Sequence, residues 1–359
     1  MSIRSTLAVI AVVASAAVGA AIGPRAAGAE QKCVPAPARA DAIGAFARQI
    51  KVGRPRKHGN LTLYPILIED VRVPDVDLTL DEAMERELLS IRELDPPEVN
   101  RVRLVSKAKE PIFVMGGEML AGAKQDRIVG DDMIVPPRAD LEIPVFCVEH
   151  GRWVAKSESF GSAKFLATRD VRVARATADQ GEVWSKVAEA QERLAAPSET
   201  GALRSLQDSA IVQDRMKPYR RALAEFPDEV AKARGVVACV GDEIIAADLF
   251  ASRAIFAQLW PKLLDSYITD AVEREPQGSS PDGVRIRRWL DGLTGADKSL
   301  KRTPGDGSLY ELRGESLIGS ALVYDEAVVH IELFAKEKLA PEPVPFNRLE
   351  FRRDRLPQE

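Results

Sequence analysis

The fold is decided by residues 111–154, which read PIFVMGGEMLAGAKQDRIVGDDMIVPPRADLEIPVFCVEHGRWV. Short apolar runs alternate here with glycines, charged residues and a Pro136-Pro137 break, which is the composition of strands joined by turns. From 141 to 147 every second residue is apolar, so these side chains share one face of a strand. Strands this close in sequence leave no room for crossover helices, and the segment therefore predicts an antiparallel sheet.

Strand patterns continue on both sides of this segment. Residues 60–71 read as a strand, and further strand patterns lie at 310–312, 317–323 and 327–334. Pro65 and Pro144 each interrupt a predicted strand. Because proline cannot donate to a β-ladder, both are expected at an edge position or a bulge.

A helix is predicted between the first strand and the central segment. The sequence Thr79-Leu80-Asp81-Glu82 is a capping box, in which Thr79 accepts from a backbone N–H of the first turn. The apolar residues that follow recur at helical spacing as far as Ile91, and Pro96-Pro97 ends the segment.

Helices and one tight hairpin are predicted in the second half of the chain. Helical patterns fill 181–226, and Gly241-Asp242 forms a two-residue turn between apolar strands. A helix containing Pro261 follows, and Ser280-Pro281 is read as the N-cap and first residue of another. Helices inserted between N-terminal and C-terminal strand groups predict an α+β fold built on a largely antiparallel β-sheet or sandwich.

The composition is that of a globular protein. Of 359 residues, 45% are hydrophobic and 29% are charged, which excludes global disorder. We expect a single α+β domain over 60–336, with a polar lead-in at 30–59 and a proline-rich tail at 337–359. The formal net charge of −4 gives no electrostatic basis for binding nucleic acid.

Residues 1–29 have the pattern of a signal peptide. Arg4 precedes an apolar run from Thr6 to Gly23, and Ala27-Gly28-Ala29 supplies small residues for cleavage. This predicts export to the periplasm or the extracellular space. The alternative is an uncleaved membrane anchor formed by residues 6–23, since a run of this length could just span a bilayer.

Cysteines give limited information about the compartment. Cys33 follows the predicted cleavage site, whereas Cys147 and Cys239 lie within apolar strand-like runs. Buried core thiols are expected at the last two positions, and a Cys147–Cys239 bridge is the alternative.

The sequence comes close to two known catalytic motifs but matches neither. Gly117-x4-Gly122 is close to a phosphate-binding loop, but Lys124 comes one position late and no hydroxyl residue follows it. Gly314-x-Ser316-x-x-Gly319 misses the nucleophile elbow by one residue. The three histidines show no metal-binding spacing, so neither a metal nor another cofactor is predicted.

Charged residues near two strand ends form the candidate ligand site. If these ends adjoin, they bring together five side chains suited to a small anion: Lys124, Gln125, Arg127, Arg152 and Trp153. Guanidinium groups match carboxylate or phosphate, and an indole offers a stacking surface. The alternative is a salt-bridge cluster that braces the sheet, with Trp153 in the core.

Catalysis would need a carboxylate and a histidine in one pocket. Glu118 or Glu149 could serve as general base, and His150 or His330 as acid. The alternatives are structural: His150 as an ordinary turn residue, and His330 as a half-exposed strand residue beside Glu332.

The central segment resembles a known bacterial family. The matching runs are 117–127, Val135-Pro136-Pro137, Ile143-Pro144-Val145 and 147–153, with weaker support from 248–250, 260–267 and 319–322 together with His330. They resemble the ADP-ribosylglycohydrolase- and rhodanese/phosphatase-superfamily-associated protein family, over roughly 60–336. The resemblance brings no established catalytic residues, and it implies a nucleotide- or ADP-ribose-like ligand or a role beside enzymes that process ADP-ribose.

Three functions are therefore open at this point. The first is an exported domain that binds a small anionic, nucleotide- or ADP-ribose-like ligand or a protein partner. The second is a hydrolase acting on a nucleotide- or ADP-ribose-related substrate. The third is a structural envelope protein without a ligand.

Overall fold

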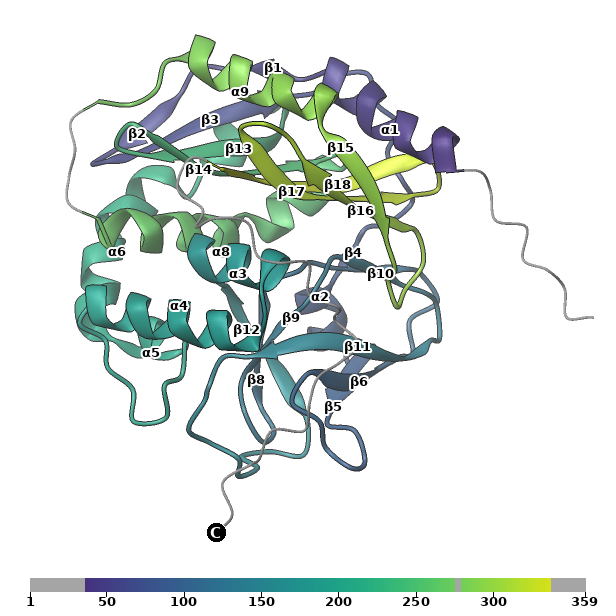
Figure 1. The fold of residues 1–359 in the computed structure, drawn as a ribbon, viewed down its shortest axis with the longest axis vertical. Coiled ribbons are helices and arrows are strands. Elements are labelled where there is room, and N and C mark those ends of the chain that lie inside the picture. Colours follow the sequence, from purple (N-terminus) through teal and green to yellow (C-terminus); the bar gives the residue numbers. More distant parts are fainter. Residues whose placement is uncertain (1–35, 275–278, 337–359) are drawn as a thin grey trace, which may run out of the picture. The chain divides into compact units, whose positions relative to one another are not determined.

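The structure, a computed structural model, describes residues 36–274 and 279–336 (Figure 1). The expected signal peptide or anchor, Cys33 and the expected tail at 337–359 lie outside these residues. No helix in the described ranges is both long and apolar enough to cross a membrane.

A nine-stranded antiparallel sheet forms the first part of the fold. Its hydrogen-bonded order is β1-β3-β13-β14-β18-β17-β16-β15, and β2 also pairs with β3. The strands are β1 (Lys51–Val52), β2 (Arg56–His58), β3 (Leu61–Leu67), β13 (Ala233–Val240), β14 (Glu243–Phe250), β15 (Asp297–Lys301), β16 (Ser308–Arg313), β17 (Leu317–Tyr324) and β18 (Ala327–Ala335).

Helices cover both faces of this sheet. Figure 1 shows α1 and α9 on one side, and α3 and α8 on the other. The helices are α1 (Ala36–Arg48), α2 (Leu80–Glu85), α3 (Arg169–Thr177), α4 (Gln180–Arg193), α5 (Ser205–Asp208), α6 (Ala210–Leu223), α7 (Phe226–Glu229), α8 (Arg253–Val272) and α9 (Gly283–Gly295).

Strand β13 shows how the sequence builds the two layers. Its side chains point alternately to the two faces. Val236 and Ala238 join the core formed with α8, whereas Val237 and Cys239 join the core formed with α1 and α9. Because both faces are buried, the strand is continuously apolar instead of alternating.

Six strands close a small barrel, in the order β11-β6-β5-β12-β8-β9. They are β5 (Leu89–Arg92), β6 (Arg101–Ser106), β8 (Glu118–Gly122), β9 (Arg127–Val129), β11 (Asp140–Cys147) and β12 (Phe160–Leu166). Ile91, Leu104 and Leu120 are fully buried in its core. A three-stranded sheet accompanies it, consisting of β4 (Leu78–Thr79), β7 (Ile112–Val114) and β10 (Met133–Val135).

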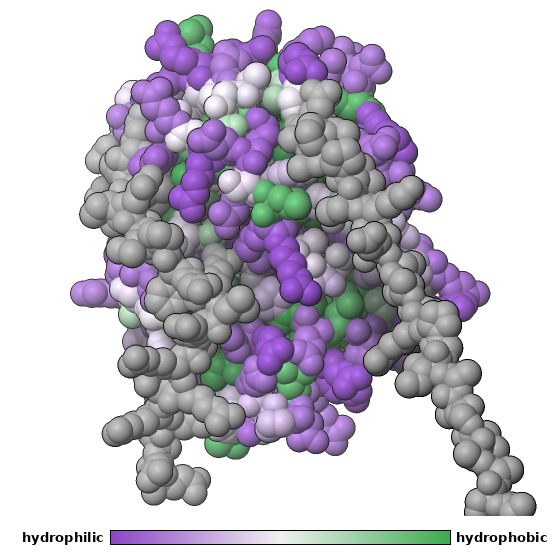
Figure 2. All heavy atoms as spheres, turned by 45° about the vertical axis from the view of Figure 1, so that its right-hand side comes forward, coloured by the Kyte–Doolittle hydropathy of each residue, from purple (hydrophilic) through white to green (hydrophobic). Residues whose placement is uncertain are grey.

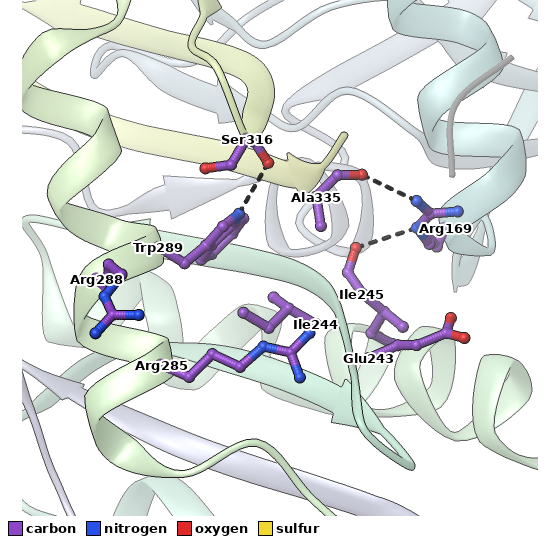
Figure 3. Close-up of a pocket in the computed structure, with 9 residues that line it drawn as sticks. All are labelled: Arg169, Glu243, Ile244, Ile245, Arg285, Arg288, Trp289, Ser316 and Ala335. Carbon is purple, nitrogen blue, oxygen red and sulfur yellow. Dashed lines mark hydrogen bonds between the residues drawn. The ribbon is translucent and has the colours of Figure 1, made fainter. Parts of the chain in front are cut away.

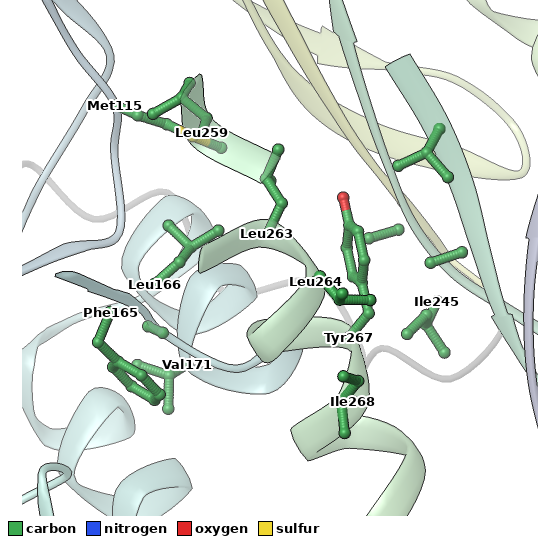
Figure 4. Packing of buried hydrophobic residues seen from close by; sticks show 14 of the residues in the cluster. Met115, Phe165, Leu166, Val171, Ile245, Leu259, Leu263, Leu264, Tyr267 and Ile268 are labelled. Carbon is green, nitrogen blue, oxygen red and sulfur yellow. The ribbon is translucent and has the colours of Figure 1, made fainter. Parts of the chain in front are cut away.

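Helix α8 packs between the barrel segments and the large sheet. In Figure 4, Leu263 lies between Met115 and Leu166 on one side and Ile245 of β14 on the other. Burying one such leucine contributes about 1.5–3 kcal/mol. This helix therefore ties the two parts of the fold together by apolar contact.

Both strand prolines lie where a strand changes partner. β2 pairs with 61–63 and β1 with 66–67 of β3, which leaves Pro65 between them, and the register with β13 shifts at the same place. β11 pairs with β6 as far as Pro144 and with β9 from Val145. A missing N–H donor costs little at such a position.

The α+β class and the antiparallel pairing are confirmed, whereas two helix boundaries differ from the prediction. Helix α2 begins after Thr79 without a side-chain capping bond and ends at Glu85. Residues 89–92 then form β5, because Leu89 and Ile91 fill the barrel with period two. Helix α9 is capped by Asp282, whose carboxylate accepts from the Arg285 N–H, and not by Ser280.

Some boundaries and the barrel were not anticipated. Helix α1 and strands β1 and β2 lie within the expected lead-in at 30–59, yet both strands pair with β3. The Gly241-Asp242 hairpin has the predicted form, with Gly241 at φ 58°. The closure of six strands into a barrel was not predicted.

Exposed hydrophobic side chains are dispersed. The face in Figure 2 shows hydrophilic residues interspersed with hydrophobic ones. The large exposed hydrophobic residues of the described ranges lie on separate elements: Val73, Val154, Ile211, Val284 and Leu300. Isolated exposed residues of this kind are normal, so they do not indicate an apolar docking surface.

Candidate functional site

The two strand ends of the central motif do adjoin. β9 pairs with β11 so that Arg127 lies opposite Cys147. The turn at 123–126 therefore lies beside the turn at 148–153. This placement brings together the residues of the candidate ligand site.

Two cations of that site lie at the indole of Trp153. Lys124 Nζ is 5.0 Å and Arg127 Cζ is 5.8 Å from the ring centroid, within the range of cation–π interaction. Arg127 is fully buried, and its Nη1 donates to Gln125 Oε1 at 2.8 Å. Its Nε and Nη2 have no hydrogen-bond partner in the described structure, and burial lowers the pKa of the guanidinium.

Gln125 and Cys147 complete this interior cluster. The Cys147 thiol lies 3.3 Å from Gln125 Oε1, and Gln125 Nε2 donates to the carbonyl of Glu149 at 3.1 Å. Cys147 and Cys239 are both buried free thiols, and burial raises their pKa, for Cys239 to about 12. They form core thiols, as expected, and not a bridge.

Arg152 turns inward and braces the motif. Its guanidinium donates to the carbonyls of Ala123 at 2.7 Å and Val154 at 2.9 Å. It also donates to Glu149 at 2.5 Å and to Asp126 at 3.2 Å. These contacts direct both terminal nitrogens of Arg152 to partners within the protein and connect the two turns, whereas its buried Nε has no hydrogen-bond partner among the described residues.

Glu149 and Asp126 reach a cavity at the edge of this cluster. The cavity has a volume of about 410 Å³ and is lined mainly by residues 195–209, together with Asp126, Glu149 and Lys156. Glu149 accepts from Thr200 Oγ1 at 2.9 Å. Burial alone would raise the pKa of Glu149, but hydrogen bonds, first among them the one from Arg152, lower it below its ordinary value.

Glu118 lies in a different buried cluster. Its carboxylate accepts from the Met115 N–H at 2.7 Å and is bonded to Lys262, which also pairs with Asp81 at 2.6 Å. Burial raises the pKa of Glu118 to about 7, against the opposing effect of Lys262. The Lys262 ammonium thus pairs with two carboxylates, those of Glu118 and Asp81.

The candidate acid–base pairs are not joined by hydrogen bonds in the described structure. His150 is exposed and packs edge-on against Trp184, with ring centroids 4.4 Å apart. His330, expected to be half-exposed, is fully buried because α3 covers this face of β18. Neither imidazole is hydrogen-bonded to Glu118 or Glu149 in the part of the chain that the structure describes.

A buried cluster that sequence reasoning missed lies where α3 meets the sheet. We call it the central charge network, and it consists of Asp132, Arg172, Arg175, Asp248, Tyr267, His330 and Glu332. Every member is at most 2% exposed. It links the loop between β9 and β10 to α3, α8, β14 and β18.

Two arginines of α3 hold the carboxylates of the sheet. Arg172 donates to Glu332 at 3.0 Å and to Asp248 at 3.2 Å. Arg175 donates to both oxygens of Glu332 at 2.6 Å and to the carbonyl of Gly130 at 2.9 Å. Arg172 Nη1 and Nη2 pair with the two oxygens of Asp248, and bidentate pairing of this kind compensates for the loss of hydration on burial.

His330 bridges two carboxylates in the same network. Its Nδ1 lies 2.6 Å from Asp132 Oδ2, and its Nε2 lies 3.2 Å from Asp248 Oδ1. Burial alone would lower the pKa of His330, but Asp132 and Asp248 raise it to about 9. The charged imidazolium therefore belongs to the native state at neutral pH.

The sequence did contain a signal for this network. Asp248 and Glu332 are single carboxylates in otherwise apolar runs, and they lie opposite each other in the β14–β18 pairing. Arg172 and Arg175 follow at a spacing of three on one helix face. Charges within fully buried strands require partners, so these residues could have been grouped from the sequence.

A second cavity lies between α9 and the ends of β14 and β18 (Figure 3). We call it the arginine cavity. Its volume is about 280 Å³, and it is lined by Arg169, Glu243, Ile244, Ile245, Arg285, Arg288, Trp289, Ser316 and Ala335. No residue of the sequence-predicted site lines it.

Comparison with known sequences places the chain in a family. A model of the ARG and Rhodanese-Phosphatase-superfamily-associated Protein domain matches residues 49–334. The chain belongs to this family. The resemblance based on the central motif is thereby confirmed. Curated proteins and solved structures give no significant match.

In this member of the ARG and Rhodanese-Phosphatase-superfamily-associated Protein domain family, the matched region contains the barrel, the central charge network and almost all of the sheet. Within the described residues, no group of three or more His, Cys, Asp or Glu side chains is arranged to hold a metal ion. The network has internal partners for its charges, whereas the two cavities present polar groups to a ligand.

Proposed function

We propose that this protein binds a small anionic ligand with a flat apolar part in the arginine cavity. The observation that carries the proposal is the combination of three guanidinium groups with an indole and an aliphatic wall in one cavity. Ligand cavities are typically apolar with a few polar groups that fix orientation. Arginine pairs well with carboxylate and phosphate because its donors form a planar fork.

The wall of the cavity is fixed by hydrogen bonds. Arg169 donates to the carbonyls of Ile245 and Ala335, both at 3.2 Å. Trp289 Nε1 donates to the carbonyl of Ser316 at 3.1 Å (Figure 3). The indole is thus held in one orientation, and such preorganisation lowers the entropy lost on binding.

Arg288 is the guanidinium available to a ligand. It is exposed on α9 and makes no hydrogen bond or ion pair with the rest of the described chain. The carboxylate of Glu243 pairs with Arg274 at 2.9 Å, which reduces its repulsion of an incoming anion. An aromatic carboxylate or aromatic phosphate matches both the charge and the size.

Binding can be measured by isothermal titration with benzoate and with phenyl phosphate. Arg288→Ala is expected to weaken binding about 10-fold, because one charge-assisted hydrogen bond contributes about 1.5–3 kcal/mol. Arg287→Ala removes the same charge from the same helix outside the cavity, and it should leave binding nearly unchanged. Absence of binding to both probes, or equal weakening in both variants, would refute the proposal.

We also propose that the protein acts after export. The support is the sequence pattern of residues 1–29, with a charged start, an apolar run and small residues before position 30. Mass spectrometry of the protein from the host's envelope fraction should find a chain that begins near residue 30. A chain that retains residues 1–29 in the cytosol would contradict this.

A further inference from the structure

The 410 Å³ cavity beside the central motif has a polar lining of mixed character. We call it the hydroxyl cavity. Its carboxylates are Asp126, Glu149 and Asp208, its hydroxyls are Ser198, Thr200, Ser205 and Ser209, and its cations are Lys156 and Arg204. Asp208 pairs with Arg204 at 3.5 Å. It shares no lining residue with the arginine cavity. Any ligand it takes is therefore independent of the anion proposed above.

One carboxylate of this cavity is already neutralised by the protein. Glu149 Oε2 accepts from Arg152 at 2.5 Å and from the Asp126 N–H at 3.1 Å. Its Oε1 accepts from Thr200 Oγ1 at 2.9 Å, and Lys156 Nζ lies 3.6 Å away. Glu149 thus orients the Thr200 hydroxyl, whose oxygen can accept from a ligand.

A second carboxylate, Asp126, can accept a further hydrogen bond. Asp126 is only 3% exposed, and its Oδ1 accepts from the Gly122 N–H at 2.9 Å and from Arg152 at 3.2 Å. Its Oδ2 accepts no hydrogen bond from the described residues, although the side chain lines the cavity. This oxygen is accessible to solvent from the cavity, so a ligand hydroxyl can donate to it in place of water.

The neighbouring charges restrict which chemical group of a ligand can donate to Asp126 Oδ2. An anion would meet Asp126 and Glu149, and an ammonium group would meet Lys156 and Arg204. An apolar ligand would leave Asp126 Oδ2 unpaired. A hydroxyl group can donate to a carboxylate and accept from a lysine, an arginine or another hydroxyl at the same time.

We infer that the hydroxyl cavity binds a neutral polyhydroxylated ligand, a sugar or cyclic polyol. One ligand hydroxyl donates to Asp126 Oδ2, and adjacent oxygens accept from Lys156, Arg204 and the Ser198 or Thr200 hydroxyls. The volume admits a single six-membered ring with its substituents.

The test uses the purified chain with D-ribose, D-glucose and myo-inositol as probes, followed by saturation-transfer NMR titration. Asp126→Asn keeps the shape but replaces the free acceptor with a donor, and it should weaken binding at least about 10-fold. Arg204 is half-exposed on the rim, so Arg204→Ala should preserve the fold and weaken binding about 3-fold. Arg221→Ala, on an exposed position of α6 outside the cavity, is the matched control.

The outcomes separate this site from the arginine cavity. Polyol binding that is lost in Asp126→Asn, reduced in Arg204→Ala and retained in Arg221→Ala and Arg288→Ala supports the inference. No saturable transfer to any of the three probes overturns it. Equal polyol affinity in the Arg204→Ala and Arg221→Ala variants would also overturn it. Tighter binding of inorganic phosphate or choline than of the polyols would do the same.

Discussion

We predict that the stability of this protein falls as the pH rises from about 6.5 to about 9, and that His330 causes the decline. The imidazole is fully buried between Asp132 and Asp248, and Arg172 balances the far side of Asp248 at 3.2 Å. Burial alone would lower the pKa of His330, but the two carboxylates raise it to about 9 from an ordinary value of 6.5. Deprotonation would leave both carboxylates without this cation.

The magnitude follows from the two pKa values. Each pH unit between them corresponds to about 1.4 kcal/mol, so the proton on His330 contributes about 3 kcal/mol. Because the folded state holds this proton more tightly, the contribution is complete below pH 6.5 and is lost as the pH rises through 9. Burial raises the pKa of Tyr267 well above its ordinary value, so its phenol stays protonated over this range.

Urea unfolding at about pH 6 and about pH 9.5 measures the effect. The wild type should lose about 3 kcal/mol of unfolding free energy between these conditions, in addition to a background from surface groups. His150→Asn changes an exposed imidazole and should show the same loss. His330→Asn should be less stable at the lower pH and should show only the background. An equal loss in the wild type and in His330→Asn would refute the reasoning.

Three further substitutions, two of them with a control variant, test the packing and charge of the fold by chemical unfolding. Glu332→Gln should lower the unfolding free energy by about 3–5 kcal/mol, because two buried guanidinium groups lose their shared carboxylate; the exposed Glu326→Gln should change it far less, and similar losses would contradict this. Gly319→Ala should prevent stable folding, because its Cβ would lie 1.9 Å from the backbone oxygen of residue 332. In the control variant Gly283→Ala, the added Cβ meets open space in α9, and the unfolding free energy should rise by about 0.5–1 kcal/mol. A stably folded Gly319→Ala protein would disprove the steric account. Asp282→Ala should cost about 1 kcal/mol because it removes the α9 cap, and an unchanged midpoint would argue against that cap.

The local rules of the sequence predicted much of the fold. Period-two apolar patterns identified the strands around the central motif, and the glycine-first turn identified the β13–β14 hairpin. The same rules were wrong for residues 86–91, where apolar residues fit a helix until Leu89 and Ile91 are placed in the barrel. Closure of the barrel depends on pairings such as Phe160 with Ile91, which no local pattern specifies.

For the candidate site, the sequence stated a condition, namely that two strand ends adjoin. The structure meets this condition, as Arg127 lies opposite Cys147. The direction in which Arg152 turns depends on the carbonyls within its reach, and these are set by turns whose geometry the sequence does not specify. The arginine cavity joins Arg169 with Trp289 and Ala335 through tertiary packing, and only the structure reveals it. The anion-binding role of Lys124, Gln125, Arg127, Arg152 and Trp153 stays a prediction.

The barrel is inserted within the sheet, and this arrangement sets an order of assembly for the chain. Its strands lie within one stretch of the sequence, from β5 to β12, whereas β3 pairs with β13 from beyond the barrel and five helices, α3 to α7. Local pairings form before distant ones because their loop-closure entropy is smaller. In a chain that emerges N-terminus first, the barrel can therefore close before β13 is available to pair with β3. During that interval the edge of β3 that later pairs with β13 is exposed, although β1 and β2 can already pair with its other edge. Protection of this apolar edge from other chains then falls to the factors that accompany synthesis.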